Sequence, residues 1–265
     1  MEWSDAVKEY VNKLNSIQIN QALLTRLYSL IDLTSLNDSD TESSMAVFSE
    51  KAISSLAHVA AVCVYPIFVR QMSAQFSGTT VKVATVANFP EGMTPLENVL
   101  IEIGRALQDG AQEIDVVFPH SRYLAGERQY AQKFVTTCKA ACGEQVLLKV
   151  ILETGALKDT AIIADAAYDV LTAGADFVKT STGKISEGAT LEVAATLLLV
   201  IKHLSQQIKR PIGIKISGGI RDIHQAAQYV ELADQVMGRD WVTNATFRIG
   251  TSKLVDEMME SSLQK

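Results

Sequence analysis

The sequence predicts an α/β protein, a (β/α)8 TIM barrel with an N-terminal helical extension, because short apolar strands alternate with longer segments of helical periodicity. Eight such strands alternate with eight helices. The strands are apolar on both faces, as strands of a parallel sheet covered by helices are. A doubly wound open sheet has the same local pattern, but no G-x-G-x-x-G motif follows the first strand, and the count of eight favours the closed barrel.

The predicted elements follow one another without a linker, so we expect residues 1–265 to form one domain, with the extension at 1–29 and the barrel at 30–262. One helix at about 4–29 forms the extension. Strands are expected at 30–34, 59–65, 81–87, 113–118, 145–152, 176–181, 212–217 and 234–238. Helices are expected at roughly 40–55, 66–77, 94–109, 127–142, 158–173, 190–208, 222–232 and 250–262. Gly110 and Gly174 stand where a helix C-terminus favours a positive φ.

Composition excludes several classes of protein. The formal net charge is −6 and the pI is near 5.3, so we expect neither nucleic acid nor an anionic membrane as a partner. The first 15 residues are too charged for a signal peptide, and no apolar run is long enough to span a membrane. Three cysteines, without a nearby histidine cluster, predict neither a disulfide framework nor a zinc site. We therefore expect a cytoplasmic protein without a metal or other cofactor.

Three polar residues interrupt the apolar strands near the ends where barrel active sites lie: Asp115, Lys179 and Lys215. A lysine buried as a cation in a strand such as DFVKTS is costly, so its pKa falls and the neutral amine becomes a nucleophile. The alternative for Lys179 is a side chain that reaches water at the strand end.

Lys215 occupies the matching place on the next strand, about 5 Å away. Two ammonium groups so close repel, which favours a neutral amine on one of them. Asp115 could hold a lysine's charge or move protons, or form a purely structural ion pair. We expect Asp115 to pair mainly with Lys215. Lys149 is a further member of this cluster that Glu153 could neutralise.

Small residues after the late strands predict a phosphate site. These residues are Thr182, Gly183, Lys184, Gly218, Gly219, Gly250 and Ser252. Gly250 and Ser252 are expected to open the last helix, whose N-terminus favours an anion, although each glycine alone is more often part of a turn.

Two other residues are weaker candidates for the pocket. Asp32 could contact a substrate hydroxyl or cap the loop after the first strand, and Cys63 is more often a small core residue than a substrate contact. Thr34, Asn37 and Asp38 fit a helix-start signal and carry little functional information.

The segments LIDLTSLN, VCVYP, VATVANFP, EIDVVFP, LLKVILETG, ADFVKTSTGK, GIKISGGIR and RIGTSKL resemble those of deoxyribose-phosphate aldolases, in family order over about residues 25–260. The most specific are VKTSTGK and IKISGGIR. The resemblance implies a class I aldolase that needs no metal and interconverts 2-deoxy-D-ribose 5-phosphate with D-glyceraldehyde 3-phosphate and acetaldehyde.

By the same resemblance, Lys179 is similar to the Schiff-base lysine, Lys215 to the lysine that perturbs it, and Asp115 to the carboxylate of the proton relay. Asp32 and Cys63 resemble positions in the substrate pocket. Gly183, Lys184, Gly218, Gly219 and Ser252 resemble the phosphate-binding set.

The chain departs from the family at Lys253, where some members have another serine, and at its end, SSLQK, where some members carry a tyrosine that assists proton exchange. Its last proton-transfer step is then expected to be slower or served by water.

Three other functions compete with this interpretation. A transaldolase-like or keto-acid aldolase barrel would share the lysine but not the DVVFP, TSTGK and SGGIR set. A catalytically idle phosphosugar-binding barrel would be suggested by loss of Lys179 or Lys215, and both are present. A metal-dependent aldolase is disfavoured because the sequence has no cluster of histidines and carboxylates. The partner we expect is a small phosphosugar, and a homodimer is an assembly that the sequence leaves open.

Overall fold

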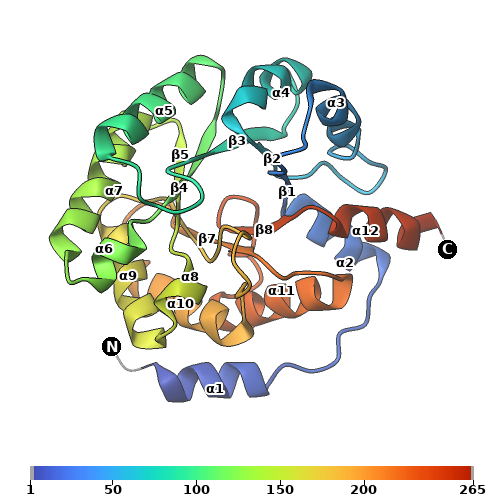
Figure 1. Ribbon diagram of the computed structural model, residues 1–265. Helices are drawn as coiled ribbons and strands as arrows, with labels where there is room; N and C mark the ends of the chain where they lie inside the picture. The colour runs from blue at the N-terminus through green and yellow to red at the C-terminus, as the bar shows by residue number, and fades with distance from the viewer. Residues whose placement is uncertain (1–2, 264–265) are drawn as a thin grey trace.

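The computed structural model describes residues 3–263, which form a closed barrel of eight parallel strands in the order β1 to β8, ringed by helices (Figure 1). The strands are β1 (Ile31–Ser35), β2 (Ala61–Val64), β3 (Lys82–Ala87), β4 (Glu113–Val117), β5 (Leu147–Ile151), β6 (Phe177–Lys179), β7 (Gly213–Ser217) and β8 (Phe247–Thr251). The (β/α)8 barrel expected from the sequence is therefore confirmed.

Helices connect consecutive strands, as parallel pairing requires, and a last helix follows β8. They are α3 (Glu42–Glu50), the short 3-10 helix η1 (Pro66–Phe68), α4 (Val69–Gln75), α5 (Leu96–Gln108), α6 (His120–Leu124), α7 (Arg128–Cys142), α8 (Thr154–Leu157), α9 (Thr160–Thr172), α10 (Leu191–Leu204), α11 (Ile223–Met237) and α12 (Leu254–Leu263). Gly110 and Gly174 follow α5 and α9 with φ of 100° and 113°, as expected for glycines that end helices.

The N-terminal extension is present, but it is two helices rather than the single helix expected at 4–29. They are α1 (Ser4–Asn12) and α2 (Gln21–Ser29). Asn20 caps α2 by accepting a hydrogen bond from the Leu23 amide. Near the C-terminal end of α2, Arg26 forms a two-pronged ion pair with Asp234 of α11 at 2.6 and 2.7 Å. The extension thus packs on the outside of the barrel (Figure 1).

The eighth strand was predicted at 234–238, and this prediction is wrong because that segment ends α11 and the eighth strand is β8. The apolar residues of 234–238 continue the buried face of α11, which includes Val230 and Ala233. A short apolar run does not distinguish a strand from a buried helix by periodicity alone. The last helix, expected from residue 250, starts at Leu254, so Gly250 lies within β8.

The interior of the barrel is divided into an apolar and a charged part. On one side Ala61 and Cys63 of β2 pack against Ala84 and Val86 of β3 in a small apolar cluster that also includes Leu36. The other strands contribute buried charged side chains to the interior, among them Asp115, Lys149 and Lys215. The large apolar core lies instead between the strands and the surrounding helices.

Candidate active site

Seven charged side chains gather inside the barrel, and we call them the floor cluster. Each is at most 3% exposed. They are Asp32 of β1, Glu113 and Asp115 of β4, Lys149 of β5, Lys179 of β6, Lys215 of β7 and Arg248 of β8. Barrel register explains their meeting, because Asp115 stands opposite Lys149, and Lys215 stands between Lys179 and Arg248 on neighbouring strands.

Asp115 is the centre of the floor cluster. Its Oδ1 lies 2.8 Å from the Lys149 Nζ, and its Oδ2 lies 2.9 Å from the Lys179 Nζ and 2.8 Å from the Lys215 Nζ. Burial alone would raise the pKa of Asp115, but the three ammonium groups hold it well below its usual range. The expectation that Asp115 pairs mainly with Lys215 is therefore wrong, since all three lysines contact it at similar distances.

The lower part of the floor cluster is a network of paired charges. Asp32 lies 2.7 Å from Lys215 and 2.6 Å from Arg248. Glu113 lies 2.9 Å from Arg248 and 2.5 Å from Lys149. All of these groups therefore have at least two partners of opposite charge, as buried ions require.

The two catalytic candidates differ in their surroundings. Burial lowers the pKa of Lys179, Asp115 opposes this effect only in part, and the nearby cation of Lys215 lowers the pKa further, so the net shift is downward. Burial also disfavours charge on Lys215, but Asp115 and Asp32 outweigh it and raise the pKa of Lys215. Lys179 is thus the amine of this pair that is more readily neutral.

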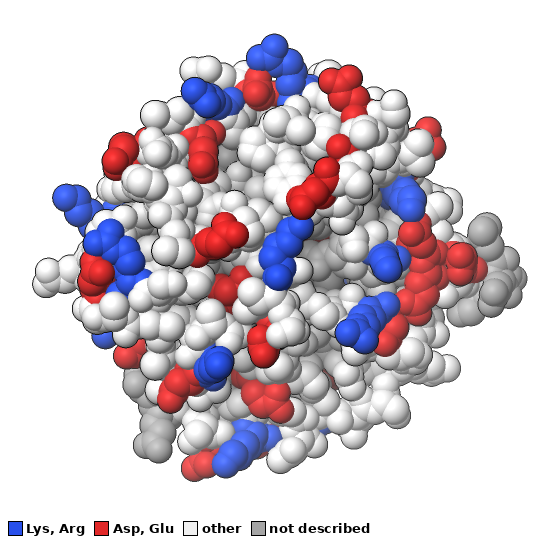
Figure 2. Space-filling model, in the orientation of Figure 1, with Lys and Arg blue, Asp and Glu red and all other residues white. Residues whose placement is uncertain are grey.

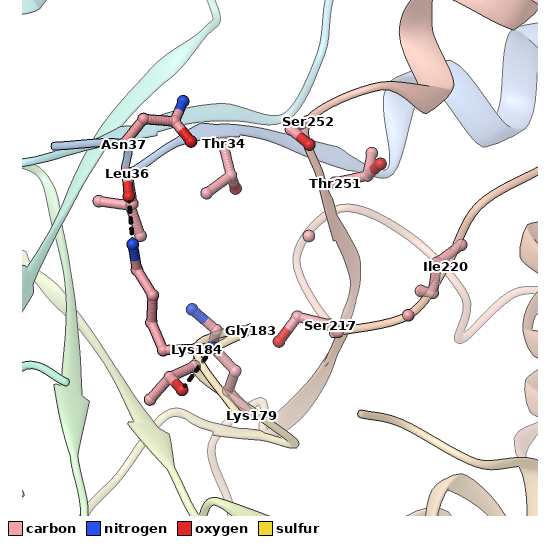
Figure 3. A pocket seen from close by; sticks show the side chains of 14 residues that line it. Thr34, Leu36, Asn37, Lys179, Gly183, Lys184, Ser217, Ile220, Thr251 and Ser252 are labelled. Atoms are coloured by element: carbon pink, nitrogen blue, oxygen red, sulfur yellow. Dashed lines mark hydrogen bonds between the residues drawn. The ribbon is translucent and has the colours of Figure 1, made fainter. Parts of the chain in front are cut away.

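A cavity of about 240 Å³ opens above the floor cluster, at the C-terminal ends of β1, β6, β7 and β8 (Figure 3). Its lining consists of Thr34, Leu36, Asn37, Lys179, Thr182, Gly183, Lys184, Ser217, Gly218, Gly219, Ile220, Gly250, Thr251 and Ser252. Lys179 is the one floor-cluster side chain among these described lining residues. A molecule in the cavity would therefore meet the Lys179 amine.

The rim of the cavity, which we define as residues 182–184, 218–220 and 251–252, is rich in small residues. Gly218 and Gly219 have φ of 85° and 81°, a backbone conformation that lets successive amides face an anion. Across the opening, the Lys184 ammonium donates a 2.6 Å hydrogen bond to the Leu36 carbonyl (Figure 3). The rim therefore supplies backbone donors and one cation, which are groups of the kind that bind anions.

Most of the residues that form this site, from Asp32 to Ile220, lie within the match to one family. The model of the DeoC/LacD family of aldolases matches residues 26–240. The chain belongs to the DeoC/LacD family of aldolases. It is an aldolase by family, with its candidate site where parallel barrels place their active sites.

Solved structures agree with this family assignment. A deoxyribose phosphate aldolase from Aeropyrum pernix, which is a tetramer, is 28% identical with a TM-score of 0.71, and the match covers 99% of each chain. A candidate deoxyribose-phosphate aldolase from Toxoplasma gondii ME49 is 27% identical with a TM-score of 0.83, covering 92% of this chain and 95% of that one. A candidate from Coccidioides immitis is 27% identical, has a TM-score of 0.77 and covers 97% and 96%.

Most of the residues that we expected in the aldolase site do come together. Lys179, Thr182, Gly183, Lys184, Gly218, Gly219, Gly250 and Ser252 line the cavity, and Lys215 and Asp115 lie directly beneath it. Gly250 contributes in an unexpected way, because a Cβ there would lie 3.0 Å from the Lys215 Cε. The glycine in β8 leaves room for the Lys215 side chain.

Two expected pocket residues are placed deeper. Asp32 is the second residue of β1 rather than its end, and its carboxylate is bound by Lys215 and Arg248. Cys63 is fully buried, with its Sγ 3.9 Å from the Asp115 Oδ2, and burial raises the pKa of its thiol. Neither is among the described residues that line the cavity.

Glu153 was a possible partner that could neutralise Lys149, and the structure does not pair them. Lys149 contacts Glu113 and Asp115, whereas the Glu153 carboxylate accepts a hydrogen bond from the Thr182 hydroxyl. The same carboxylate lies 3.3 Å from the Thr182 amide nitrogen. Glu153 thus orients the rim loop after β6 rather than the floor.

Several residues of the site were missed or undervalued, among them Leu36, Ser217, Ile220 and Thr251 of the cavity lining. Thr34 and Asn37 line the cavity, although they were dismissed as a helix-start signal, and Thr41 caps α3 instead. Arg248 and Glu113 were not singled out at all. The signal for Arg248 was an arginine between two apolar residues of FRIG, which the misplaced eighth strand concealed.

Other features of the described chain bear on partners. Among residues 3–263, no helix is both long and apolar enough to cross a membrane. In the same range, no group of three or more His, Cys, Asp or Glu side chains is arranged to hold a metal ion. Figure 2 shows acidic and basic side chains interspersed over the face that it presents.

The cysteines Cys63, Cys138 and Cys142 are free thiols. The chain's terminal Lys265, where some relatives were expected to carry a tyrosine, lies outside the described residues.

Proposed function

We propose that the protein is a deoxyribose-phosphate aldolase, which cleaves 2-deoxy-D-ribose 5-phosphate to D-glyceraldehyde 3-phosphate and acetaldehyde through a Schiff base on Lys179. The observation that carries the proposal is the placement of Lys179. It is 2% exposed, it lies at the cavity surface, and its pKa is lowered by burial and by the adjacent Lys215 cation. A buried amine with these neighbours is a nucleophile for a carbonyl carbon.

The chemistry follows from the neutral amine. The Lys179 nitrogen attacks the C1 aldehyde of the open-chain sugar, water leaves, and a protonated imine forms. Loss of the proton from the 3-hydroxyl then breaks the C2–C3 bond, and the bonding electrons form an enamine while glyceraldehyde 3-phosphate departs. Protonation of C2 and hydrolysis of the imine release acetaldehyde and restore the amine.

Lys215 and Asp115 serve the proton transfers in this proposal. The raised pKa of Lys215, which the Asp115 and Asp32 carboxylates produce against the effect of burial, keeps a proton available within the floor cluster. Asp115 contacts both lysines through one oxygen, so a proton that leaves one lysine remains beside the other. Water in the cavity would complete the path to C2 and the 3-hydroxyl.

The rim is proposed to hold the 5-phosphate. The backbone amides around Gly218 and Gly219, the Ser252 hydroxyl and the Lys184 ammonium can converge on an anion. The Lys184 ammonium has donors left for an anion besides the one bound to the Leu36 carbonyl. The expected partners are accordingly a phosphosugar and no metal or cofactor. A reducing cytoplasm suits the three free thiols, and the sequence leaves a homodimer open.

The test is cleavage of 2-deoxy-D-ribose 5-phosphate by the purified protein, followed by separate enzymatic measurement of acetaldehyde and glyceraldehyde 3-phosphate. We expect both products in equal amounts, with activity that survives exhaustive chelation. A panel of keto-acid and ketose-phosphate substrates tests the rival aldolases. Turnover of one of these with no cleavage of deoxyribose phosphate, or activity that requires added metal, would overturn the proposal.

A further inference from the structure

The floor cluster contains an unequal number of positive and negative groups. Its four basic side chains are Lys149, Lys179, Lys215 and Arg248, and its three carboxyl groups are Asp32, Glu113 and Asp115. All seven are at most 3% exposed, so water does little to stabilise an excess charge there. With every carboxyl group ionised, the four basic groups outnumber the carboxylates by one. The arrangement of lowest free energy then has one lysine amine in its neutral form.

The contacts indicate which amine that is. Lys149 contacts Asp115 at 2.8 Å and Glu113 at 2.5 Å, and Lys215 contacts Asp115 at 2.8 Å and Asp32 at 2.7 Å. Among residues 3–263, Lys179 has a single carboxylate partner, Asp115 at 2.9 Å, which the other two lysines share. Lys179 is therefore the surplus amine.

Arg248 creates this surplus. A guanidinium stays protonated at any ordinary pH, so Arg248 cannot be the group that becomes neutral. Two of its nitrogens bind carboxylates, Nη1 to Asp32 at 2.6 Å and Nη2 to Glu113 at 2.9 Å. Much of the negative charge of Asp32 and Glu113 is therefore balanced by Arg248 rather than by the lysines. Without Arg248, three amines would face three carboxylates, and each amine could remain charged.

We propose that Arg248 is a positioning residue for the chemistry of Lys179: its permanent charge at the bottom of the barrel, bound by Asp32 and Glu113, keeps the Lys179 amine neutral. Arg248 is not among the described residues that line the cavity, so it acts without touching substrate. The inference rests on the proposed function only in taking neutral Lys179 as the nucleophile.

Three other titratable groups that face Lys179 also influence its charge. From the strands around it, Asp115 favours a charged Lys179, and Lys215 disfavours it. Cys63 of β2 favours the charged form weakly as an anion, but burial raises the pKa of this thiol, so it stays neutral. All three groups remain in a variant of Arg248, so a change in the pKa of Lys179 in that variant reports the effect of Arg248.

The experiment measures how readily Lys179 is acetylated by acetic anhydride as pH is varied, with peptide mass mapping to identify the residue. This readout needs no sugar substrate, so it gives an answer even if deoxyribose phosphate is not the substrate. In Arg248→Met, we expect the pH midpoint of Lys179 to rise by about one unit, which lowers the neutral fraction at pH 7 about tenfold. Arg248→Lys, which retains a basic group at this position, should shift it less.

Two further variants separate charge from structure. Glu113→Gln increases the surplus, so the Lys179 midpoint should fall below that of the wild type. The double variant Arg248→Met/Glu113→Gln removes one charge of each sign, so the midpoint should return toward the wild-type value even if both single variants are less stable. Arg70→Met, at an exposed arginine on α4, is the matched control and should leave the midpoint unchanged because solvent screens its charge.

A purely structural role for Arg248 predicts a different pattern. The double variant would then be further from wild type than either single variant, and Glu113→Gln would not move the Lys179 midpoint downward. Either result, or an unchanged midpoint in folded Arg248→Met, would overturn the inference. If Arg248→Met does not fold, Glu113→Gln and the double variant still decide the sign. If the Lys179 midpoints are as expected but the protein does not cleave deoxyribose phosphate, only the proposed function is overturned.

Discussion

The floor cluster and the rim differ in which groups carry charge and in where those groups lie. The floor consists of buried side chains on strands, with seven ionisable groups packed against one another. The rim consists mainly of glycines and hydroxyl residues on loops, with Lys184 as its cation. Strands fix side chains to within fractions of an ångström, which proton transfer and bond formation need, whereas loops present backbone amides that can close around an anion.

The difference predicts how each region responds to mutation. Removing one charge from the floor leaves other buried charges unbalanced, so the effects should spread through the cluster and change pH dependence. Removing one group from the rim should weaken binding of a phosphate and little else.

Asp115→Asn should give the largest loss, because Asp115 contacts three lysines at once. We expect kcat/KM to fall about 10³- to 10⁴-fold, near the upper range for a proton-transfer group. Thermal unfolding should show lower stability as well, since breaking a buried ion pair costs about 3–5 kcal/mol. Asp176→Asn is the matched control, because this carboxylate is bound by Lys139 and Arg210 and lies outside the floor cluster. If the control loses as much activity per folded molecule, the special role of Asp115 is wrong.

Lys215→Leu should lower kcat/KM about 10²- to 10³-fold at neutral pH. Removing this cation relieves the repulsion that lowers the pKa of Lys179, so the pKa of Lys179 should rise. Because the neutral amine reacts, the acidic limb of the pH profile should move to higher pH. Alkaline pH should restore Schiff-base formation but not full turnover, since the proton donor is also lost. A profile with an unchanged acidic limb would contradict the coupling between the two lysines.

Lys184→Met tests the rim. We expect KM for 2-deoxy-D-ribose 5-phosphate to rise about tenfold, as for the loss of one charge-assisted hydrogen bond, with little change in kcat. The much poorer reaction of 2-deoxyribose without phosphate should be unaffected. Lys82→Met, at an exposed lysine that begins β3, is the control for loss of a positive charge. Equal kcat/KM for the two sugars in the wild type would show that the rim holds no phosphate.

Cys63→Ala should have the smallest effect, with kcat/KM within about twofold to threefold of the wild type. Its thiol is 3.9 Å from Asp115, and such a contact is weak. The apolar neighbours Ala61 and Ala84 limit the rearrangement that a smaller side chain permits. Steady-state kinetics over a range of pH measures the effect. A loss comparable to that of Asp115→Asn would show that Cys63 takes part in the reaction rather than only packing inside the barrel.

The sequence predicted the parts of this molecule that depend on local pattern. Lys179 and Lys215 could be found because each interrupts an apolar strand, and their pairing follows from the neighbouring positions of consecutive strands. The position of Arg248 could not be found in this way. Its contact with Asp32 joins residues 216 apart and exists only because β8 closes the barrel onto β1. Once the eighth strand was misplaced in α11, this contact could not be expected.

The roles of some residues could not be predicted because their sequence context fits two different interpretations. Thr34 and Asn37 carry side chains typical of turns and helix starts, and only the closed barrel brings them to the cavity opposite the late strands. Glu153 next to Lys149's strand was an apparent ion-pair partner, but its backbone has a φ of 53° and its carboxylate reaches Thr182 instead. Sequence proximity thus indicated the correct region but the wrong contact.

The most direct test of the central claim is to trap the covalent intermediate. The protein is incubated with 2-deoxy-D-ribose 5-phosphate and borohydride, and the reduced adduct is located by peptide mass mapping, with Lys179→Ala as the control. We expect one adduct, on Lys179, that is absent from the control variant and still present on Lys179, at a slower rate, in Lys215→Leu. An adduct on Lys215 with Lys179 unmodified, or no adduct under conditions where the sugar is cleaved, would contradict the account.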